Sequence, residues 1–437
     1  MSIKYIHSAD LHLDSPLKGL GTTDPIIAAK IRETTRKAFE NLVSFAIQEK
    51  VSFILIAGDL VDGRWDDTAT GLWTLRQFKR LNEHRIRVFI VFGNHDLQNR
   101  MIQSLSWPEN VFVFPSSQAE TVLLEDERIA IHGQSYSKSE CRTNLSLQYP
   151  VAENGYFNIG LLHTSLAGEN SNDPYSPTSL ALLNSKQYDY WALGHTHFSQ
   201  TFQEIPFWIG YSGMLQGRHV RETGAKGFLV CELEKGRLIH SPQFIESDVL
   251  RWFLVEWDLS NIESSSSSLT QWKETFLSLF EEKLSEIQEA AEHRFAAVRF
   301  ILSGKTPLHQ LTLSIQSLED WTNEIHLAAQ AFEASLWIEE IQWKTSLLVD
   351  ISLFNSSGLL GELLNEMEKR CQSFSDNKNL NSFQQQTQEH IWFQDLQKRI
   401  GSKLEEAGID LEDSFLLQQY YEQARDLLIN SFDANLE

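Results

Sequence analysis

The stretch VFIVFGNHD, residues 88–96, decides the fold that we expect for this chain of 437 residues. Its apolar, β-branched half predicts a buried strand, and Asn94, His95 and Asp96 follow where that strand ends. Four other apolar runs end in polar clusters that hold, in order, Asp10 and His12, Asp59, His163, and His195 and His197. In an open α/β sheet, ligands gather outside the carboxyl ends of the strands. We therefore expect all five clusters to line one crevice.

The first half of the chain alternates strand-like and helix-like segments. Helical patterns at about Ile26–Glu49 and Ala69–Glu83 separate the first strands, which predicts an α/β domain with a substantial sheet over residues 1–248. The expected strands are Lys4–His7, Val51–Ala57, Arg87–Phe92, Phe157–Leu162, Tyr188–Leu193, Phe207–Tyr211 and Gly227–Leu233.

The pattern changes near residue 248. A small α+β domain is expected over residues 249–354, with strands at Trp252–Asp258, Val298–Leu302 and Ile338–Leu347 and a helix at Trp272–Arg294. Residues 355–437 are expected to be helical. Apolar stripes at Phe393–Leu404 and Leu417–Phe432 fit either core packing in a helical tail or docking onto the helices of a partner.

The donor set of the five clusters predicts a metal centre. Carboxylate, amide and imidazole donors without a thiolate suit manganese, iron or zinc, and suit calcium poorly. Asp59 has two oxygens and a full charge, so it can bridge two cations, and a pair about 3.5–4 Å apart can clamp a phosphate during in-line displacement. The glycines before Asp59, Asn94 and His195 would allow tight turns.

Single members of the pattern are weak indicators. A lone His163 is typical of a core or capping histidine, and a lone Asp10 or Asp59 is typical of a helix cap or turn. The five clusters in this order, each after an apolar run, are a strong signal. His7, His84 and His132 fall outside the pattern and are interpreted as structural.

The net charge of −22 is unevenly distributed along the chain. Residues 1–250 carry 23 Lys and Arg against 28 Asp and Glu, whereas residues 251–437 carry 14 against 31. A protein that holds nucleic acid by itself usually presents a basic face. Either the substrate is small, or another subunit supplies much of the grip on a nucleic acid.

Cysteine usage and hydropathy indicate a cytoplasmic protein with no membrane partner. Cys141, Cys231 and Cys371 are far apart and form no CxxC pair, which fits a reducing compartment. No apolar run approaches the roughly 18 residues that span a bilayer. The segment Met1–Asp10 has no apolar core or cleavage site typical of a secretory signal.

Two motifs carry a resemblance to a known family. They are Ser8-Ala9-Asp10-Leu11-His12-Leu13-Asp14-Ser15-Pro16, and Gln216-Gly217-Arg218-His219 followed by Glu222-Thr223-Gly224. With the strand-end clusters, they resemble the calcineurin-like metallophosphoesterases and, within them, the SbcD/YhaO-type DNA-repair exonucleases. The resemblance covers roughly residues 1–250. It implies two mixed sheets packed face to face with helices outside, followed by a small capping domain and then helices.

The resemblance also implies roles for individual residues. One metal would take Asp10, His12, Asp59 and His197, and the other would take Asp59, Asn94, His163 and His195. His95 would face the phosphate and stabilise the transition state or protonate the leaving oxygen, with Asp96 orienting it. The most basic local cluster, namely Arg218, His219, Arg221 and Lys226, would either contact phosphates or form a solvated loop.

Three functions are weighed against one another. The favoured one is a dinuclear, most simply manganese-dependent, DNA phosphodiesterase that acts with the coiled-coil ATPase partner which the resemblance implies. The second is a phosphatase or phosphodiesterase of a small molecule or phosphoprotein. The phosphoprotein branch is disfavoured because Asp62-Gly63-Arg64 and Asp96 stand where that branch has other residues. The third is a mainly scaffolding role. A homodimer is left open.

Overall fold

The protein is described by a computed structural model covering residues 2–15, 31, 33–62, 69–99, 101–102, 105–166, 175–262, 268–312 and 314–347. The predicted helical region 355–437, with its two apolar stripes, lies outside the described residues. The chain divides into two compact units. The first comprises Met1–Val255, Leu284–Phe300 and Ala331–Glu340; the second comprises the described parts of Glu256–Lys283, Ile301–Gln330 and Ile341–Glu437. The expected domain boundaries at 248 and 354 remain predictions.

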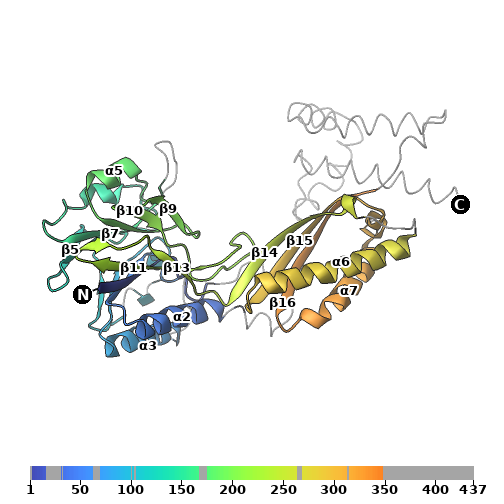
Figure 1. Cartoon of the computed structure of the whole chain (residues 1–437), viewed down its shortest axis with the longest axis horizontal. Helices are drawn as coiled ribbons and strands as arrows, with labels where there is room; N and C mark the ends of the chain where they lie inside the picture. Colours follow the sequence, from blue (N-terminus) through green and yellow to red (C-terminus); the bar gives the residue numbers. More distant parts are fainter. Residues whose placement is uncertain are drawn as a thin grey trace, which may run out of the picture. The chain divides into compact units, whose positions relative to one another are not determined.

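The first unit contains a seven-stranded mixed sheet in the order β12-β11-β1-β2-β3-β4, with β13 also paired to β11 (Figure 1). Strands β1 to β4 run parallel, and β11 runs antiparallel to β1. The bounds are β1 Ser2–Ser8, β2 Phe53–Ala57, β3 Arg87–Val91, β4 Val111–Val113, β11 Gly227–Glu234, β12 Arg237–Leu238 and β13 Gln243–Glu246.

A second, six-stranded sheet has the order β5-β6-β7-β8-β10-β9. Its middle strands β6, β7, β8 and β10 are parallel, and β5 and β9 are antiparallel edges. The bounds are β5 Glu120–Leu124, β6 Ile129–Gly133, β7 Phe157–His163, β8 Tyr190–Gly194, β9 Gln200–Gln203 and β10 Trp208–Tyr211.

The two sheets pack face to face over a shared apolar core. Tyr5 stacks on Phe53 from the first sheet, with ring centroids 4.8 Å apart, and Tyr190 stacks on Trp208 from the second at 4.6 Å. Both pairs belong to one buried cluster. Strand β2, FILIA, is buried throughout, as its unbroken apolar run predicts for a strand covered on both faces. The expected double-sheet sandwich is therefore confirmed.

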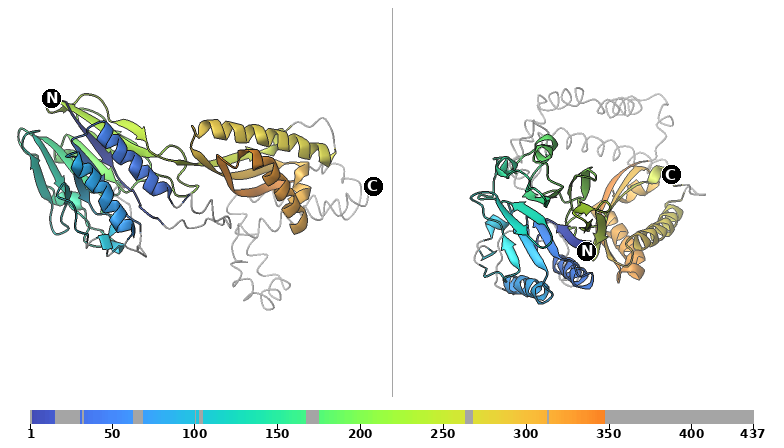
Figure 2. Two further views of the ribbon diagram at one scale, coloured as in Figure 1. Left: turned by 90° about the horizontal axis from the view of Figure 1, so that it is seen from below. Right: turned by 60° about the vertical axis from the view of Figure 1, so that its left-hand side comes forward.

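Helices and irregular segments cover the outer faces. Helices α2 (Thr34–Gln48) and α3 (Ala69–Glu83) lie against the first sheet, side by side (Figures 1 and 2). The short helix α5 (Leu180–Ser185) packs with Tyr149 and Trp191 on the second sheet. Short 3-10 turns occur at Asp96–Gln98, Leu145–Gln148, Leu259–Asn261, Pro307–Thr312 and Gln330–Phe332.

A three-stranded sheet, β14-β15-β16, follows in the second half. Its elements are β14 Leu250–Asp258, α6 Leu269–Ala290, β15 Phe295–Lys305, α7 Ile315–Ala329 and β16 Leu336–Ser346. In the second unit, Phe276 of α6 contacts Trp257, Trp321 and Trp343, with centroids 5.3, 5.5 and 6.3 Å away. These aromatic contacts form a local core between helices and strands, as expected for a small α+β domain. Among the described residues, no helix is both long and apolar enough to pass through a bilayer.

Two of the histidines interpreted as structural are buried in the sheets. His7 Nδ1 lies 3.0 Å from the Tyr190 hydroxyl, and its Nε2 lies 3.0 Å from the Leu193 carbonyl oxygen. Burial lowers the pKa of His7 to about 3, against the opposing hydrogen bond with Leu193. Burial likewise lowers the pKa of His132 to about 4, although its bond to Asn158 opposes the change.

These pKa values predict acid-sensitive stability. Both folded pKa values lie below the ordinary value of 6.5. The unfolded chain therefore binds more protons below pH 6.5, and stability falls as the pH drops from there toward 3. The limiting slope is about 1.4 kcal/mol per pH unit for each buried histidine. In urea unfolding at pH 7 to 5, His7→Gln should show a smaller loss than the parent, whereas exposed His84→Gln should not. An unchanged slope in His7→Gln would contradict this.

Candidate active site

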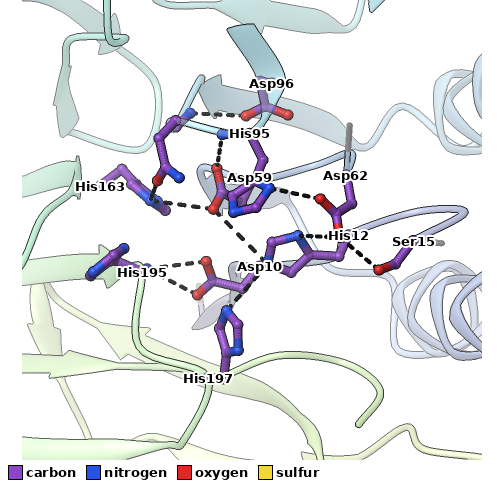
Figure 3. Close-up of polar contacts among 12 residues, drawn as sticks. Asp10, His12, Ser15, Asp59, Asp62, His95, Asp96, His163, His195 and His197 are labelled. Atoms are coloured by element: carbon purple, nitrogen blue, oxygen red, sulfur yellow. Dashed lines mark hydrogen bonds and ion pairs between the residues drawn. The ribbon is translucent and has the colours of Figure 1, made fainter. Parts of the chain in front are cut away.

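The carboxyl ends of five parallel strands from the two sheets meet at one place. Asp10 follows β1, Asp59 follows β2, Asn94 follows β3, His163 ends β7, and His195 follows β8. Figure 3 shows Asp59 between His163 and His12, with His197 beside Asp10. Three groups of possible ligand atoms lie together, namely Asp10-His12-His197, Asp10-Asp59-His163 and His12-Asp62-His95. The predicted ligands thus gather where strands of the two sheets end, rather than along one sheet.

The backbone at the site adopts conformations that side chains disfavour. Asp10, His12 and Asp59 have φ values of 50°, 44° and 50°, and His195 has φ 112°. The left-handed region is uncommon outside glycine and often marks functional sites. Two backbone hydrogen bonds join the loop after β1 to the loop after β2. Asp10 N donates to Gly58 O at 3.0 Å, and His12 N donates to Asp59 O at 3.0 Å.

The glycines before the ligands are needed for space. A Cβ on Gly194 would lie 1.8 Å from the Ala57 carbonyl oxygen, and one on Gly93 would lie 2.4 Å from Asp59 Oδ1. A Cβ on Gly58 would lie 2.3 Å from His163 Nδ1, and Gly58 alone of the three has a positive φ, 93°. The expectation of tight turns therefore holds for Gly58, and close approach explains the other two.

His163 presents a lone pair to two other acceptors. Its Nδ1 donates to the Ala57 carbonyl oxygen at 2.9 Å, which leaves Nε2 as the acceptor in a neutral ring. That Nε2 lies 3.1 Å from Asn94 Oδ1 and 3.5 Å from Asp59 Oδ2. These three atoms each offer an electron pair and have no proton between them, so a bound cation would fit among them.

His12 and His197 show the same feature. The His197 Nδ1 donates to Glu222 Oε1 at 2.6 Å, so its Nε2 is an acceptor, and that Nε2 lies 3.2 Å from His12 Nε2. His12 Nδ1 is buried without a hydrogen-bond partner, 3.9 Å from Asp62 Oδ2. A cation accepting both Nε2 lone pairs would leave the proton of His12 on Nδ1, near that carboxylate. The residues therefore fit a cation here as well.

Burial sets the ionisation of the site. Burial, followed by the charge of Arg218, holds the pKa of His12 well below its usual range, which keeps the ring neutral as a ligand must be. Burial raises the pKa of Asp10, although neighbouring histidines oppose this. Removing carboxylates from water is costly unless positive charge compensates, which again favours cations.

The ring of His195 stands apart from the three groups. Its backbone N–H donates to both Asp10 oxygens at 3.1 and 2.9 Å, while its ring centroid lies 5.3 Å from that of His163. The ring also packs on Tyr175 at 4.8 Å. The structure thus places His195 at the site and shows a backbone role in holding Asp10. Its role as a metal ligand stays a prediction.

His95 is oriented by Asp62, and the expected pairing with Asp96 was wrong. His95 Nδ1 bonds Asp62 Oδ1 at 2.7 Å. Burial would lower the pKa of His95, but the bond to Asp62 together with the negative charges of Asp59 and Asp62 outweighs burial and raises the pKa. Asp96 instead accepts from the backbone N–H groups of Val61 and Gly93, at 3.0 and 2.9 Å. Its carboxylate therefore ties together the loops after β2 and β3.

The basic cluster divides into exposed and committed side chains. The Arg218 side chain is 12% exposed and donates to Asp62 and Glu222, at 2.8 and 3.1 Å. Lys226 is buried, donates to the Thr223 carbonyl oxygen, and has its pKa lowered to about 8 by burial. His219 and Arg221 are exposed. His219 and Arg221 are therefore the members of this cluster that remain accessible as candidate phosphate contacts.

Sequence comparison identifies the class of protein. Residues 3–199 match the model for calcineurin-like phosphoesterases, and residues 252–346 match that for the middle domain of metallophosphoesterase YhaO. The chain is 30% identical over 370 residues to the uncharacterized metallophosphoesterase YhaO of Bacillus subtilis (strain 168), covering 84% of this chain and 87% of that protein. The chain belongs to the calcineurin-like metallophosphoesterases, in the SbcD/YhaO-type branch, and is a metal-dependent phosphoesterase.

Two further proteins are similar at lower identity. The SbcD component of the nuclease SbcCD from Staphylococcus epidermidis is 25% identical over 295 residues, covering 60% of this chain and 74% of that protein. A dimetal phosphatase from Danio rerio matches 56% of this chain and 99% of its own, at 12% identity and a TM-score of 0.33.

The arrangement predicts two divalent cations per chain. Asp59 Oδ2 lies 3.9 Å from His12 Nε2 and 3.5 Å from His163 Nε2, between the two donor groups. Elemental analysis of protein saturated with manganese and then desalted should give two ions. Asp59→Ala should lose both, because each group loses a charged donor, whereas exposed Asp126→Ala should keep both. A single ion in the parent would rule out the dinuclear assignment.

Chemistry and metal binding should separate at His95. Its Nδ1 is occupied by Asp62, and it is not among the predicted ligands. His95→Ala should retain two ions but lose turnover of a small phosphodiester by ~100-fold or more, as for a lost acid or oxyanion donor. The exposed histidine variant His84→Ala should match the parent. If His95→Ala also turned over at the parental rate, its catalytic role would be wrong.

Proposed function

We propose that this chain is a manganese-dependent DNA nuclease, with exonuclease activity in DNA repair. The similarity to a component of a nuclease over 74% of that protein's length carries this proposal. The donor set supports it, since nitrogen and oxygen ligands without thiolate suit manganese, with iron or zinc as alternatives.

The site supports hydrolysis of a phosphodiester in the following way. Two divalent cations held by the predicted ligands would neutralise the phosphate and polarise its phosphorus–oxygen bonds. His95, whose side chain is 33% exposed and bonded to Asp62, would donate a proton to the leaving oxygen. Asp62 keeps the proton on Nδ1 and fixes the ring. Asp59 Oδ1 accepts from the His95 backbone N–H at 2.9 Å, which ties the metal-facing carboxylate to the acid.

Charge favours a partner that holds the DNA. Binding a polyanion needs several Lys and Arg contacts. Arg218 and Lys226 are committed to internal bonds, which leaves His219 and Arg221 exposed in this cluster. Residues 251–437 carry 14 Lys and Arg against 31 Asp and Glu. We therefore propose that a coiled-coil ATPase grips the DNA and docks on residues 356–437, which lie outside the described part of the chain.

A nuclease assay tests the proposal. Full-length chain, purified at low salt, should cleave end-labelled linear DNA with manganese, and added salt should weaken this cleavage more than hydrolysis of a small phosphodiester. Cleavage should increase with an ATPase that copurifies from native lysate, and His95→Ala should abolish it, which excludes a contaminating nuclease. Rapid hydrolysis of the small ester with intact DNA, with and without copurifying proteins, would instead favour a small-substrate phosphodiesterase.

A further inference from the structure

We propose that Arg218 is a positioning residue that couples the catalytic histidine His95 to the metal-facing histidine His197. Its guanidinium donates from Nη1 to Asp62 Oδ2 at 2.8 Å and from Nη2 to Glu222 Oε1 at 3.1 Å. Asp62 holds His95, and Glu222 holds His197, at 2.7 and 2.6 Å. The Arg218 guanidinium thus holds both of the carboxylates that orient the two histidine rings. The proposal rests on phosphoester hydrolysis and is independent of DNA as the substrate.

The chemistry of the guanidinium suits this position. The side chains of Asp62 and Glu222 are 16% and 3% exposed, so each carboxylate has lost most of its water. Two such groups close together repel and need a cation between them. A planar guanidinium can donate in two fixed directions at once, whereas the ammonium of lysine is a single point charge. Arginine is therefore matched to two carboxylates that face different histidines.

The backbone around Arg218 is also fixed. The Arg218 N–H donates to Glu222 Oε2 at 2.7 Å, so this carboxylate binds both ends of the residue. The preceding Gly217 carbonyl accepts from the buried Trp252 indole at 3.0 Å. Gln216 Oε1 accepts from Val249 N–H at 2.9 Å. The first residues of β14 and those just before it thus support the loop that carries Arg218.

Substrate contact is the competing role for Arg218. Its side chain is 12% exposed, and both terminal nitrogens already donate to carboxylates. Nη1 also lies 3.3 Å from Ser15 Oγ, which itself donates to Asp62 at 2.6 Å. A phosphate would have to displace these bonds to reach the guanidinium. The two roles differ in what they predict for metal affinity, because only positioning acts in the absence of substrate.

The test is metal binding without substrate, followed by kinetics on a small phosphodiester. Manganese affinity of the metal-free full-length protein is measured by competition with a chromogenic chelator. Arg218→Ala should weaken one of the two sites by about 10–100-fold, the size expected for losing the support of a ligand. Arg218→Ala should also lower kcat with little change in KM. Added guanidinium should restore part of the manganese affinity and part of kcat. Exposed Arg142→Ala should change neither property.

Double variants separate the two arms of the network. Adding Glu222→Gln to Arg218→Ala should cost less manganese affinity than the sum of the single changes, because both act through His197. Adding Asp62→Asn should likewise be less than additive on kcat, because both act through His95. Residues in one network couple, whereas independent residues add.

Several outcomes would overturn the proposal. A raised KM with unchanged manganese affinity and kcat in Arg218→Ala would make Arg218 a substrate contact. Full additivity in both pairs of variants would make the residues independent. Near-ultraviolet circular dichroism checks folding. If Arg218→Ala is unfolded, Arg218→Lys replaces it and should show the same losses in part, since lysine cannot bridge both carboxylates. Parental metal affinity and kcat in folded Arg218→Lys would also reject the coupling.

Discussion

The site depends on a surplus of buried electron pairs over protons. His163 Nε2 faces Asn94 and Asp59 oxygens, and His197 Nε2 faces His12 Nε2, while Nδ1 of His163 and Nδ1 of His197 are already bonded to acceptors. Such a collection is stable only with positive charge among it. The double-sheet framework brings this collection together, because parallel strands of both sheets end at the same place and three glycines let the loops touch.

A chain of hydrogen bonds, in which carboxylates alternate with basic side chains, links His95 to His197. It runs from His95 through Asp62, Arg218 and Glu222 to His197, with each bond between 2.6 and 3.1 Å. Burial would raise the pKa of Glu222, but its bond to His197 and the charge of Arg218 lower the pKa to about 2. The second sequence motif supplies Arg218 and Glu222, so it contributes to the active site although neither residue is among the predicted ligands.

The sequence predicted what depends on local pattern. All seven strands expected in the first half are present, because each is a largely buried and mostly apolar run. Six of them have parallel neighbours, and β11 is antiparallel. Strands β4, β5, β9, β12 and β13 were missed because they are short or partly exposed. The buried parallel strand β6 was also missed, because its apolar run Ile129–Ile131 is only three residues long. The partners of the histidines were missed for a different reason. Asp96 is adjacent to His95 in sequence, whereas the true partner Asp62 lies 33 residues away, and Glu222 lies 25 residues from His197. Only the folded chain brings such pairs together. The one sequence feature that could have indicated Asp62 as the partner of His95 is its position in the cluster Gly58-Asp59-Leu60-Val61-Asp62-Gly63, directly after a strand.

The central claim is that one carboxylate, Asp59, joins two cations into a single centre. Electron paramagnetic resonance of the manganese-loaded protein tests this most directly, because two ions that share a ligand couple magnetically. The account predicts the multiline spectrum of an exchange-coupled pair at full loading. A spectrum of isolated manganese ions at two equivalents per chain would contradict it.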